Sequence, residues 1–139
     1  MTRDELSLIA GIHRLAVVDR QASARVARLL CIGEMEARAV IGLASGARSS
    51  RGSLQVELEM SAGGAAALAE RLIHDRLVDS EPDPERPRAA RLRLSAGAQL
   101  ELEAALDVFA GSSGDIAARM PAAERRAVVA CLLAVSRSA

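Results

Sequence analysis

Apolar residues recur at every third or fourth position through both ends of the chain, which is the pattern of amphipathic helices. This pattern predicts helices over residues 3–19, 20–30, 34–44, 96–110 and 121–136. Thr2 is placed to cap the first helix, with Glu5 three positions later as its partner in a capping box. Gly33 separates the second helix from the third, Gly111–Gly114 interrupts the fourth, and Pro121 suits the first turn of the last.

The middle of the chain carries signals for two shorter helices. A loop rich in serine and glycine over 45–53 precedes a short predicted helix, which runs from a cap at Ser53 through Met60. Ser61 is a good cap for the next predicted helix, over 62–75. A short helix, a tight turn and a second helix together form the layout of a helix-turn-helix.

A β-hairpin is predicted directly after these two helices. Alternation of residue types over 77–81 and 90–94 is typical of strands, and in the second segment the arginines point one way and the leucines the other. Three prolines stand between the segments, at Pro82, Pro84 and Pro87. They predict a long, stiffened loop without regular pairing. The predicted fold is therefore mainly α with a small β-hairpin wing, a winged helix-turn-helix.

The predicted winged module leaves apolar faces at both chain ends uncovered. Its own inward positions are Leu54, Leu58, Leu68 and Leu72. The outer helices carry further apolar faces, made by Leu6, Ile9, Ile12, His13, Ala16 and Val17 and by Val128, Cys131, Leu132 and Val135. Because a small winged module has too little surface to cover both faces, a two-fold dimer built from the chain ends is expected to bury them.

Composition narrows the class of protein. A chain of 139 residues suits one domain, half of the residues are hydrophobic, and no apolar run is long enough to span a bilayer. Without a secretion signal, the expected location is the cytoplasm. All 18 basic residues are arginine, which with the many alanines suggests a GC-rich bacterial genome. The formal net charge is zero, which weighs against nucleic-acid binding, and Phe109 as the only aromatic argues against stacking on single strands.

The residues that usually carry catalysis or metal binding form no recognisable motif. Cys31 and Cys131 are isolated, so a zinc site is not expected, and both thiols are predicted to be small buried hydrophobic groups. No Ser/His/Asp or Cys/His grouping and no phosphate-cradling loop is present. The protein is therefore expected to be a non-enzyme without a metal or other cofactor.

The ordered set of motifs resembles the MarR family (multiple antibiotic resistance regulators) of bacterial repressors. The resemblance rests on Leu54, Leu58-Glu59-Met60-Ser61, Leu68-Ala69-Glu70-Arg71-Leu72, Leu77-Val78, Pro82-Asp83-Pro84, Arg88, Arg91-Leu92-Arg93-Leu94-Ser95 and Met120-Pro121. It implies one domain over 1–139, in which 21–98 form the winged module and 1–20 and 99–139 form dimerisation helices. It further implies a homodimer that binds palindromic double-stranded operator DNA, often released by a small-molecule effector.

The same resemblance implies roles for individual residues. Ala62–Ala69 would be the recognition helix in the major groove, and Arg88 would be the wing arginine that enters the minor groove. The full set of predicted DNA contacts is Arg48, Arg51, Ser53, Ser61, Gly63, Gly64, Ala66, Ala67, Arg71, Arg86 and Arg88. For Arg71, an ion pair with Glu70, Asp75 or a wing acid is the open alternative. His13 and His74 are the candidates for an effector pocket.

The chain departs from the family pattern at several of these positions. Arg86 stands where an acidic residue is usual, two positions before the wing arginine, and Pro87 replaces an arginine. The alanines at 65–67 offer no hydrogen bonds to base edges, and Asp79 and Glu81 add negative charge to a strand that is often basic. These departures favour a second hypothesis, a winged-helix dimer with degenerate DNA reading that acts as a ligand-binding or protein-interaction module.

Overall fold

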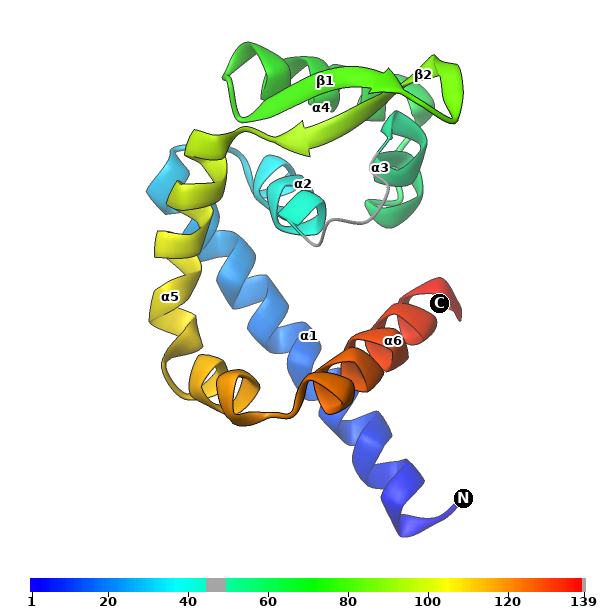
Figure 1. Cartoon of the computed structure of the whole chain (residues 1–139), viewed down its shortest axis with the longest axis vertical. Helices are drawn as coiled ribbons and strands as arrows, with labels where there is room; N and C mark the ends of the chain where they lie inside the picture. The colour runs from blue at the N-terminus through cyan, green and yellow to red at the C-terminus, as the bar shows by residue number, and fades with distance from the viewer. Residues whose placement is uncertain (45–49, 139) are drawn as a thin grey trace. The chain divides into compact units, whose positions relative to one another are not determined.

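The computed structural model describes residues 1–44 and 50–138, with the side chains of these residues except at 87, 108–114 and 136–138. The elements of these ranges are α1 (Arg3–Leu30), α2 (Glu34–Ala44), α3 (Arg51–Glu57), α4 (Ala62–His74), β1 (Val78–Asp83), β2 (Arg86–Leu94), α5 (Ala96–Arg119) and α6 (Ala122–Ser138), as Figure 1 shows. They form two compact units, Met1–Ala105 and Leu106–Ala139, and the boundary lies within α5. The predicted class, mainly α with one small hairpin, is confirmed.

α1 runs without a break through the first two predicted helices. Thr2 begins it with the predicted capping box: its hydroxyl accepts a hydrogen bond from the Glu5 backbone N–H (3.1 Å), and its own N–H donates to the Glu5 carboxylate (2.7 Å). The helix ends at Cys31, which adopts a left-handed conformation with a φ of 54°. α2 then covers the predicted range 34–44.

The core of the first unit lies where α2, α3, α4 and the hairpin meet the second half of α1 and the first turns of α5. All four leucines predicted for this core are buried, and the largest fully buried side chains are Leu54, Leu68, Leu72, Leu92, Leu102, Val26, Val40 and Val78. Each buried leucine or valine contributes about 1.5–3 kcal/mol relative to exposure. This core holds the helix-turn-helix and the wing in one unit.

The wing hairpin has a short turn, so the predicted long loop is wrong, whereas the pairing is irregular near the tip, as predicted. β1 and β2 pair antiparallel, from Val78 opposite Leu94 to Pro82 opposite Ala90 and Asp83 opposite Arg86. Only Pro84 and Glu85 lie between the strands. In a two-stranded sheet each strand keeps one free edge, so a proline nitrogen that lacks a hydrogen atom can face outward at no cost to the pairing.

The predicted limits of α3 are also wrong. Its N-cap is Ser50, and Ser53 is the third helical residue. The two serines cap each other, because the Ser53 N–H donates to the Ser50 hydroxyl (3.1 Å) and the Ser50 N–H donates to the Ser53 hydroxyl (2.8 Å). At the other end, Glu59 has a φ of 50°, so the helix stops at Glu57 and does not reach Met60.

Three further predictions need correction. α5 continues through Gly111–Gly114, because glycine lowers helix propensity but, unlike proline, still donates its backbone hydrogen bond. α6 begins at Ala122, one residue after Pro121. Cys31 and Cys131 are both exposed, not buried, since Cys31 lies at a helix end and Cys131 lies on α6, whose described side chains are all exposed.

The terminal helices leave much apolar surface uncovered within each unit. In α1 before Asp19, the large exposed apolar residues are Leu6, Leu8, Ile9, Leu15, Val17 and Val18. In the second unit, those of α6 are Val128, Val129, Leu132, Leu133 and Val135. None of the described helices is long and apolar enough to cross a membrane.

Candidate nucleic-acid interface

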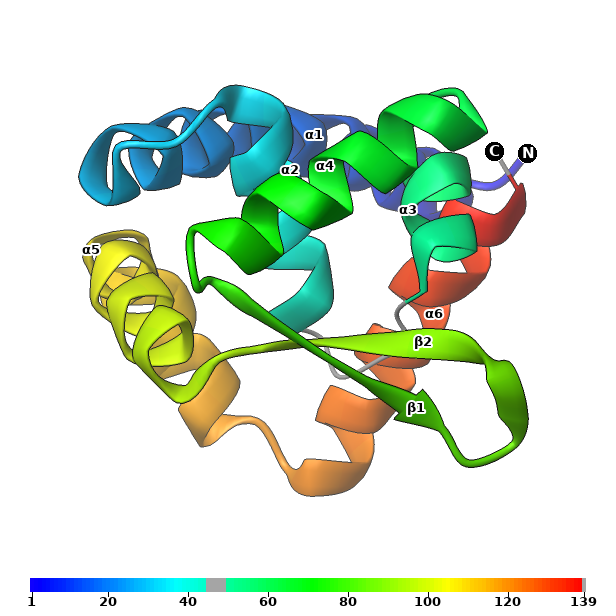
Figure 2. The same cartoon turned by 90° about the horizontal axis from the view of Figure 1, so that it is seen from above.

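The helix-turn-helix consists of α3, a left-handed turn and α4. α3 packs against α4, and the fully buried leucines of the two helices are Leu54, Leu68 and Leu72. At the turn, the Met60 N–H bonds to the Gln55 carbonyl (3.0 Å) and the Glu59 N–H to the Val56 carbonyl (3.3 Å). These two bonds close the end of α3 in the Schellman pattern. Figure 2 shows α3 and the hairpin on the same side of α4.

The start of α4 presents a bare backbone. The Ser61 hydroxyl accepts a hydrogen bond from the Gly64 N–H (3.0 Å), which caps the helix as predicted. A Cβ at Gly64 would lie 3.1 Å from the Ser61 hydroxyl oxygen, a tight contact that favours glycine at this position. A Cβ at Gly63 would have no other atom within 4 Å, so the space beside this residue is open, and Ala67 is also exposed. The outer surface of these turns therefore lets another molecule approach the backbone closely.

The charged residues of α4 pair with neighbouring helices. Glu70 forms an ion pair with Arg51, the first residue of α3. Arg71 donates to Glu36 of α2 (3.2 Å), a partner that differs from the three acids considered in the sequence. The Arg51–Glu70 pair is largely exposed, so it contributes at most about 1 kcal/mol, whereas in the second pair Arg71 is exposed and Glu36 is partly buried. An anion that binds the guanidinium group more strongly than the glutamate can therefore replace that glutamate as the partner of either arginine.

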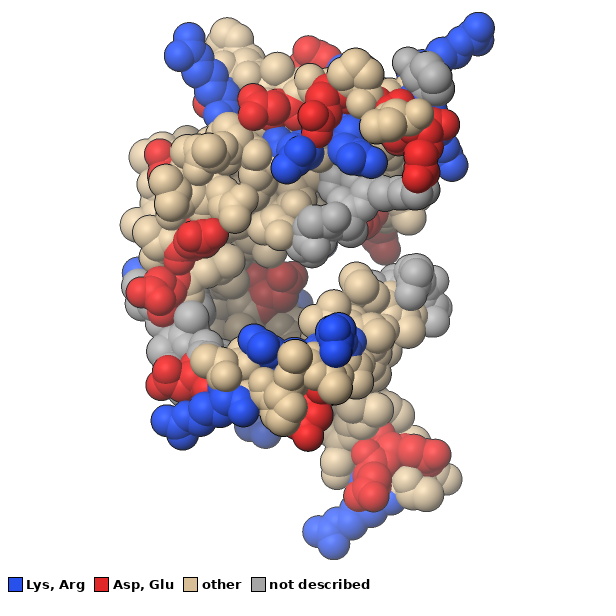
Figure 3. Space-filling model, viewed as in Figure 1, with Lys and Arg blue, Asp and Glu red and all other residues tan. Residues whose placement is uncertain are grey.

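The wing divides its arginines into two groups. Arg91 pairs with Asp83 (3.9 Å) and Arg93 with Glu81 (3.3 Å), both across the hairpin. Arg86 and Arg88 are exposed and have no ion pair among the described residues. Figure 3 shows the result, with acidic and basic side chains intermixed over the hairpin.

A β-bulge sets the position of Arg88. Pro82 pairs with Ala90 and the next residue, Asp83, pairs with Arg86, so residues 87–89 have no partner on β1. A bulge of this kind bends its strand and re-aims the side chains on it. In the wing it directs the segment around Arg88 toward the first turn of α3, because Arg88 and Ala89 line a cavity together with the residues of that turn.

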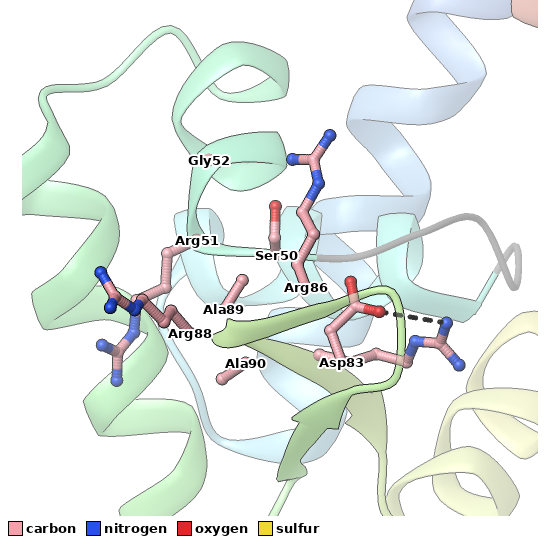
Figure 4. A pocket seen from close by; sticks show the side chains of 9 residues that line it. Ser50, Arg51, Gly52, Asp83, Arg86, Arg88, Ala89 and Ala90 are labelled. Atoms are coloured by element: carbon pink, nitrogen blue, oxygen red, sulfur yellow. Dashed lines mark ion pairs between the residues drawn. The ribbon is translucent and has the colours of Figure 1, made fainter.

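This cavity of about 410 Å³ lies between α3 and the wing (Figure 4). Its lining residues are Ser50, Arg51, Gly52, Asp83, Arg86, Arg88, Ala89, Ala90 and Arg91. It brings together three of the predicted DNA contacts, Arg51, Arg86 and Arg88. Arg91 also lines the cavity but was not among the predicted DNA contacts. The alternation of residue types along its strand predicted only that it faces away from the buried leucines.

The remaining predicted residues lie elsewhere. Arg48 lies outside the described residues. His13 is exposed on α1 and His74 is exposed at the last residue of α4. Neither lines the cavity between α3 and the wing, nor a second cavity of about 400 Å³ between α1 and α5. Among the described residues, no three His, Cys, Asp or Glu side chains gather as a metal site requires.

Solved structures match this chain, whereas no protein-family model and no curated protein does. A mutant of MepR from S. aureus, bound to an oligodeoxyribonucleotide, covers 99% of this chain and 98% of its own, with a TM-score of 0.57 and 15% identity. Wild-type MarR from E. coli, in its apo form, covers 97% and 96%, with a TM-score of 0.57 and 16% identity. An S. aureus MepR–DNA complex covers 91% and 95%, with a TM-score of 0.59 and 13% identity.

These similarities extend over nearly the whole chain and include the helix-turn-helix, the wing and the terminal helices. At identities of 13–16% they concern the fold. The protein therefore has the winged helix-turn-helix fold of the MarR regulators.

Proposed function

We propose that this protein is a transcriptional regulator that binds double-stranded operator DNA as a homodimer. Two observations carry the proposal: the bare start of α4, and a wing with two arginines, Arg86 and Arg88, that have no ion pair among the described residues. The fold supports it, because a MepR of the same fold is bound to DNA. In keeping with the family resemblance, we propose that it acts as a repressor relieved by a small-molecule effector.

α4 would act as the recognition helix. Its first N–H groups and its dipole favour a phosphate near Ser61, and the absence of a side chain at Gly63 permits close approach. Ala66 and Ala67 would contact thymine methyl groups in the major groove, without hydrogen bonds to base edges. Much of the sequence preference would then come from DNA shape, with Arg88 in a narrow minor groove.

Residues around α3 would position the duplex through its backbone. Arg51 would exchange Glu70 for a phosphate, Arg71 would do the same with Glu36, and Ser53 and Arg86 would lie nearby. Arg48 remains a candidate from its sequence position. Such contacts carry no sequence information but fix the register of the protein on DNA.

The test of this function removes the wing arginine. Arg88→Ala is expected to weaken operator binding about tenfold and to reduce the slope of log affinity against log salt by about 1, as for one lost cationic contact. A gel-shift titration at physiological salt measures this, and Arg28→Ala, which removes the same charge at the end of α1, is the matched control. If the Arg88→Ala variant remains a dimer and binds the operator as tightly as the wild type, Arg88 does not contact DNA.

A second candidate function is a winged-helix dimer that has lost DNA reading and binds a ligand or another protein. The zero net charge, the alanines of α4 and the acids of β1 favour it. A salt titration with operator and unrelated duplexes separates the two functions. DNA affinity that is weak at all salt concentrations and equal for both duplexes supports the second candidate.

A further inference from the structure

The cavity between α3 and the wing concentrates positive charge in a chain whose formal net charge is zero. Four arginines line it against a single aspartate. Asp83 is engaged by Arg91 (3.9 Å), and Glu70, the partner of Arg51, belongs to α4 and does not line the cavity. The lining therefore holds a surplus of guanidinium groups that no described carboxylate neutralises from within.

These arginines come from both walls of the cavity, Arg51 from α3 and the other three from the wing. Figure 4 shows the Arg51 and Arg88 side chains extending next to each other, while Arg86 points away from them, beside Ser50. Arg91 is paired with Asp83 (3.9 Å). Between them the wing contributes only the methyl groups of two alanines, so the cavity stays open. Its volume of about 410 Å³ lies within the range of small-molecule sites.

We propose that this cavity binds a small organic anion with two or more acidic groups, carboxylate or phosphate, and that this ligand competes with operator DNA for the same arginines. A guanidinium group presents paired N–H donors that match a carboxylate or a phosphate. A compact polyanion can reach donors on both walls at once, whereas a singly charged anion can satisfy only one. The binding part stands on the cavity alone; the competition rests on the proposed function.

The occupant is assigned as a free anion because the site is concave. A duplex presents its phosphates along a convex surface, so that a single phosphate at the mouth would leave most of the cavity unfilled. Arg51, Arg86 and Arg88, which the proposed function assigns to DNA, would then be shared between two ligands. Binding of one would lower the affinity for the other by the same factor.

The first experiment measures anion binding without DNA. Citrate and inorganic pyrophosphate are titrated into the dimer by calorimetry at constant ionic strength, with acetate as the singly charged control. Arg91→Ala is expected to weaken citrate binding at least tenfold. Arg93→Ala, which removes the next wing arginine outside the cavity, is expected to bind citrate like the wild type. Ala89→Glu, which places a carboxylate inside the cavity and keeps every arginine, is expected to abolish binding.

Several outcomes would overturn the proposal. Absence of citrate and pyrophosphate binding to the wild type up to millimolar concentration overturns it, as does equal binding by the wild type and Ala89→Glu. If Arg91→Ala weakens the DNA complex while neither anion binds, the cavity seats a backbone phosphate and the free-anion assignment is wrong. Circular dichroism of each variant confirms that the fold is retained.

The second experiment measures competition with a labelled operator duplex at fixed ionic strength. Citrate is expected to displace the duplex from the wild type and from Arg93→Ala, but not from Ala89→Glu. Displacement that is equal for all three proteins would overturn the competition. A wild type that binds citrate but no duplex would refute the proposed function and leave the anion site standing.

Discussion

Arginine supplies every basic side chain of this protein, so the role of each one depends on what lies within reach of its guanidinium group. Arg71 and Arg93 each donate to a glutamate of a neighbouring element, at 3.2 and 3.3 Å. Arg86 and Arg88 project from the wing without an ion pair among the described residues. A sequence in which all basic residues are identical does not distinguish these roles, because they arise from contacts between elements.

Glu70 is the residue that most opposes DNA at the proposed interface. It is the only acidic side chain on α4, it is exposed, and it holds Arg51. Glu70→Gln is expected to strengthen binding to any duplex severalfold and to steepen its salt dependence, because it removes a negative charge and frees a cation. Fluorescence anisotropy against salt concentration measures both effects. Glu103→Gln on α5 is the control, and equal behaviour of the two variants would contradict the role of Glu70.

At the scale of elements, three helices end with a non-glycine residue in the left-handed region. Cys31, Glu59 and Arg76 have φ values of 54°, 50° and 60°. In each case backbone N–H groups close the helix end with bonds of 3.0–3.4 Å to carbonyls of its last turn. A left-handed conformation costs a residue with a Cβ about 1–2 kcal/mol, so these turns are formed at some expense of stability.

Glu59 offers a direct test, because glycine adopts a positive φ without the steric cost that a Cβ imposes. Glu59→Gly is expected to raise the free energy of unfolding by about 0.5–1 kcal/mol, since relief of the left-handed strain exceeds the added chain entropy. Urea denaturation followed by circular dichroism measures it. Glu101→Gly, the same replacement within α5, is expected to lower the free energy of unfolding by about 1 kcal/mol. Destabilisation of similar size in both variants would contradict the strain at Glu59.

At the scale of the whole molecule, each unit has a terminal helix with exposed apolar residues. Ile9 on α1 is 44% exposed and Val128 on α6 is 45% exposed, and similar residues lie one or two turns away. Extended apolar surface of this kind is typical of association, and a stable interface buries on the order of 1,600 Å² in total. A second copy of the chain is the partner that the family resemblance implies.

The homodimer is tested by sedimentation velocity. The wild type is expected to be a dimer at micromolar concentration, and Ile9→Glu or Val128→Glu is expected to raise the dissociation constant at least tenfold, because each would bury an unpaired carboxylate. Val56→Glu, at an exposed apolar residue of α3, is expected to remain a dimer. A monomeric wild type, or dissociation of the Val56→Glu variant alone, would refute an interface built from the terminal helices.

The sequence by itself determined the order and type of the elements. Ser61, the leucines of α3 and α4 and the alternation in β2 act over a few residues, so capping and burial follow from local spacing. The predicted DNA contacts stay predictions, but the sequence did identify three arginines that lie together, Arg51, Arg86 and Arg88. Local patterns did not predict the start of α3, because Ser50 and Ser53 are both suitable N-caps and the helix begins after Ser50.

Only the tertiary structure decided how these residues are combined. The pairing of Arg71 with Glu36 and of Arg51 with Glu70 joins residues that are 35 and 19 positions apart, which no local pattern encodes. The wing bulge depends on the register between two strands, and the cavity exists because that bulge lies against the first turn of α3. Register and packing depend on interactions across the whole unit, and they bring four arginines that are dispersed in the sequence to the lining of one cavity.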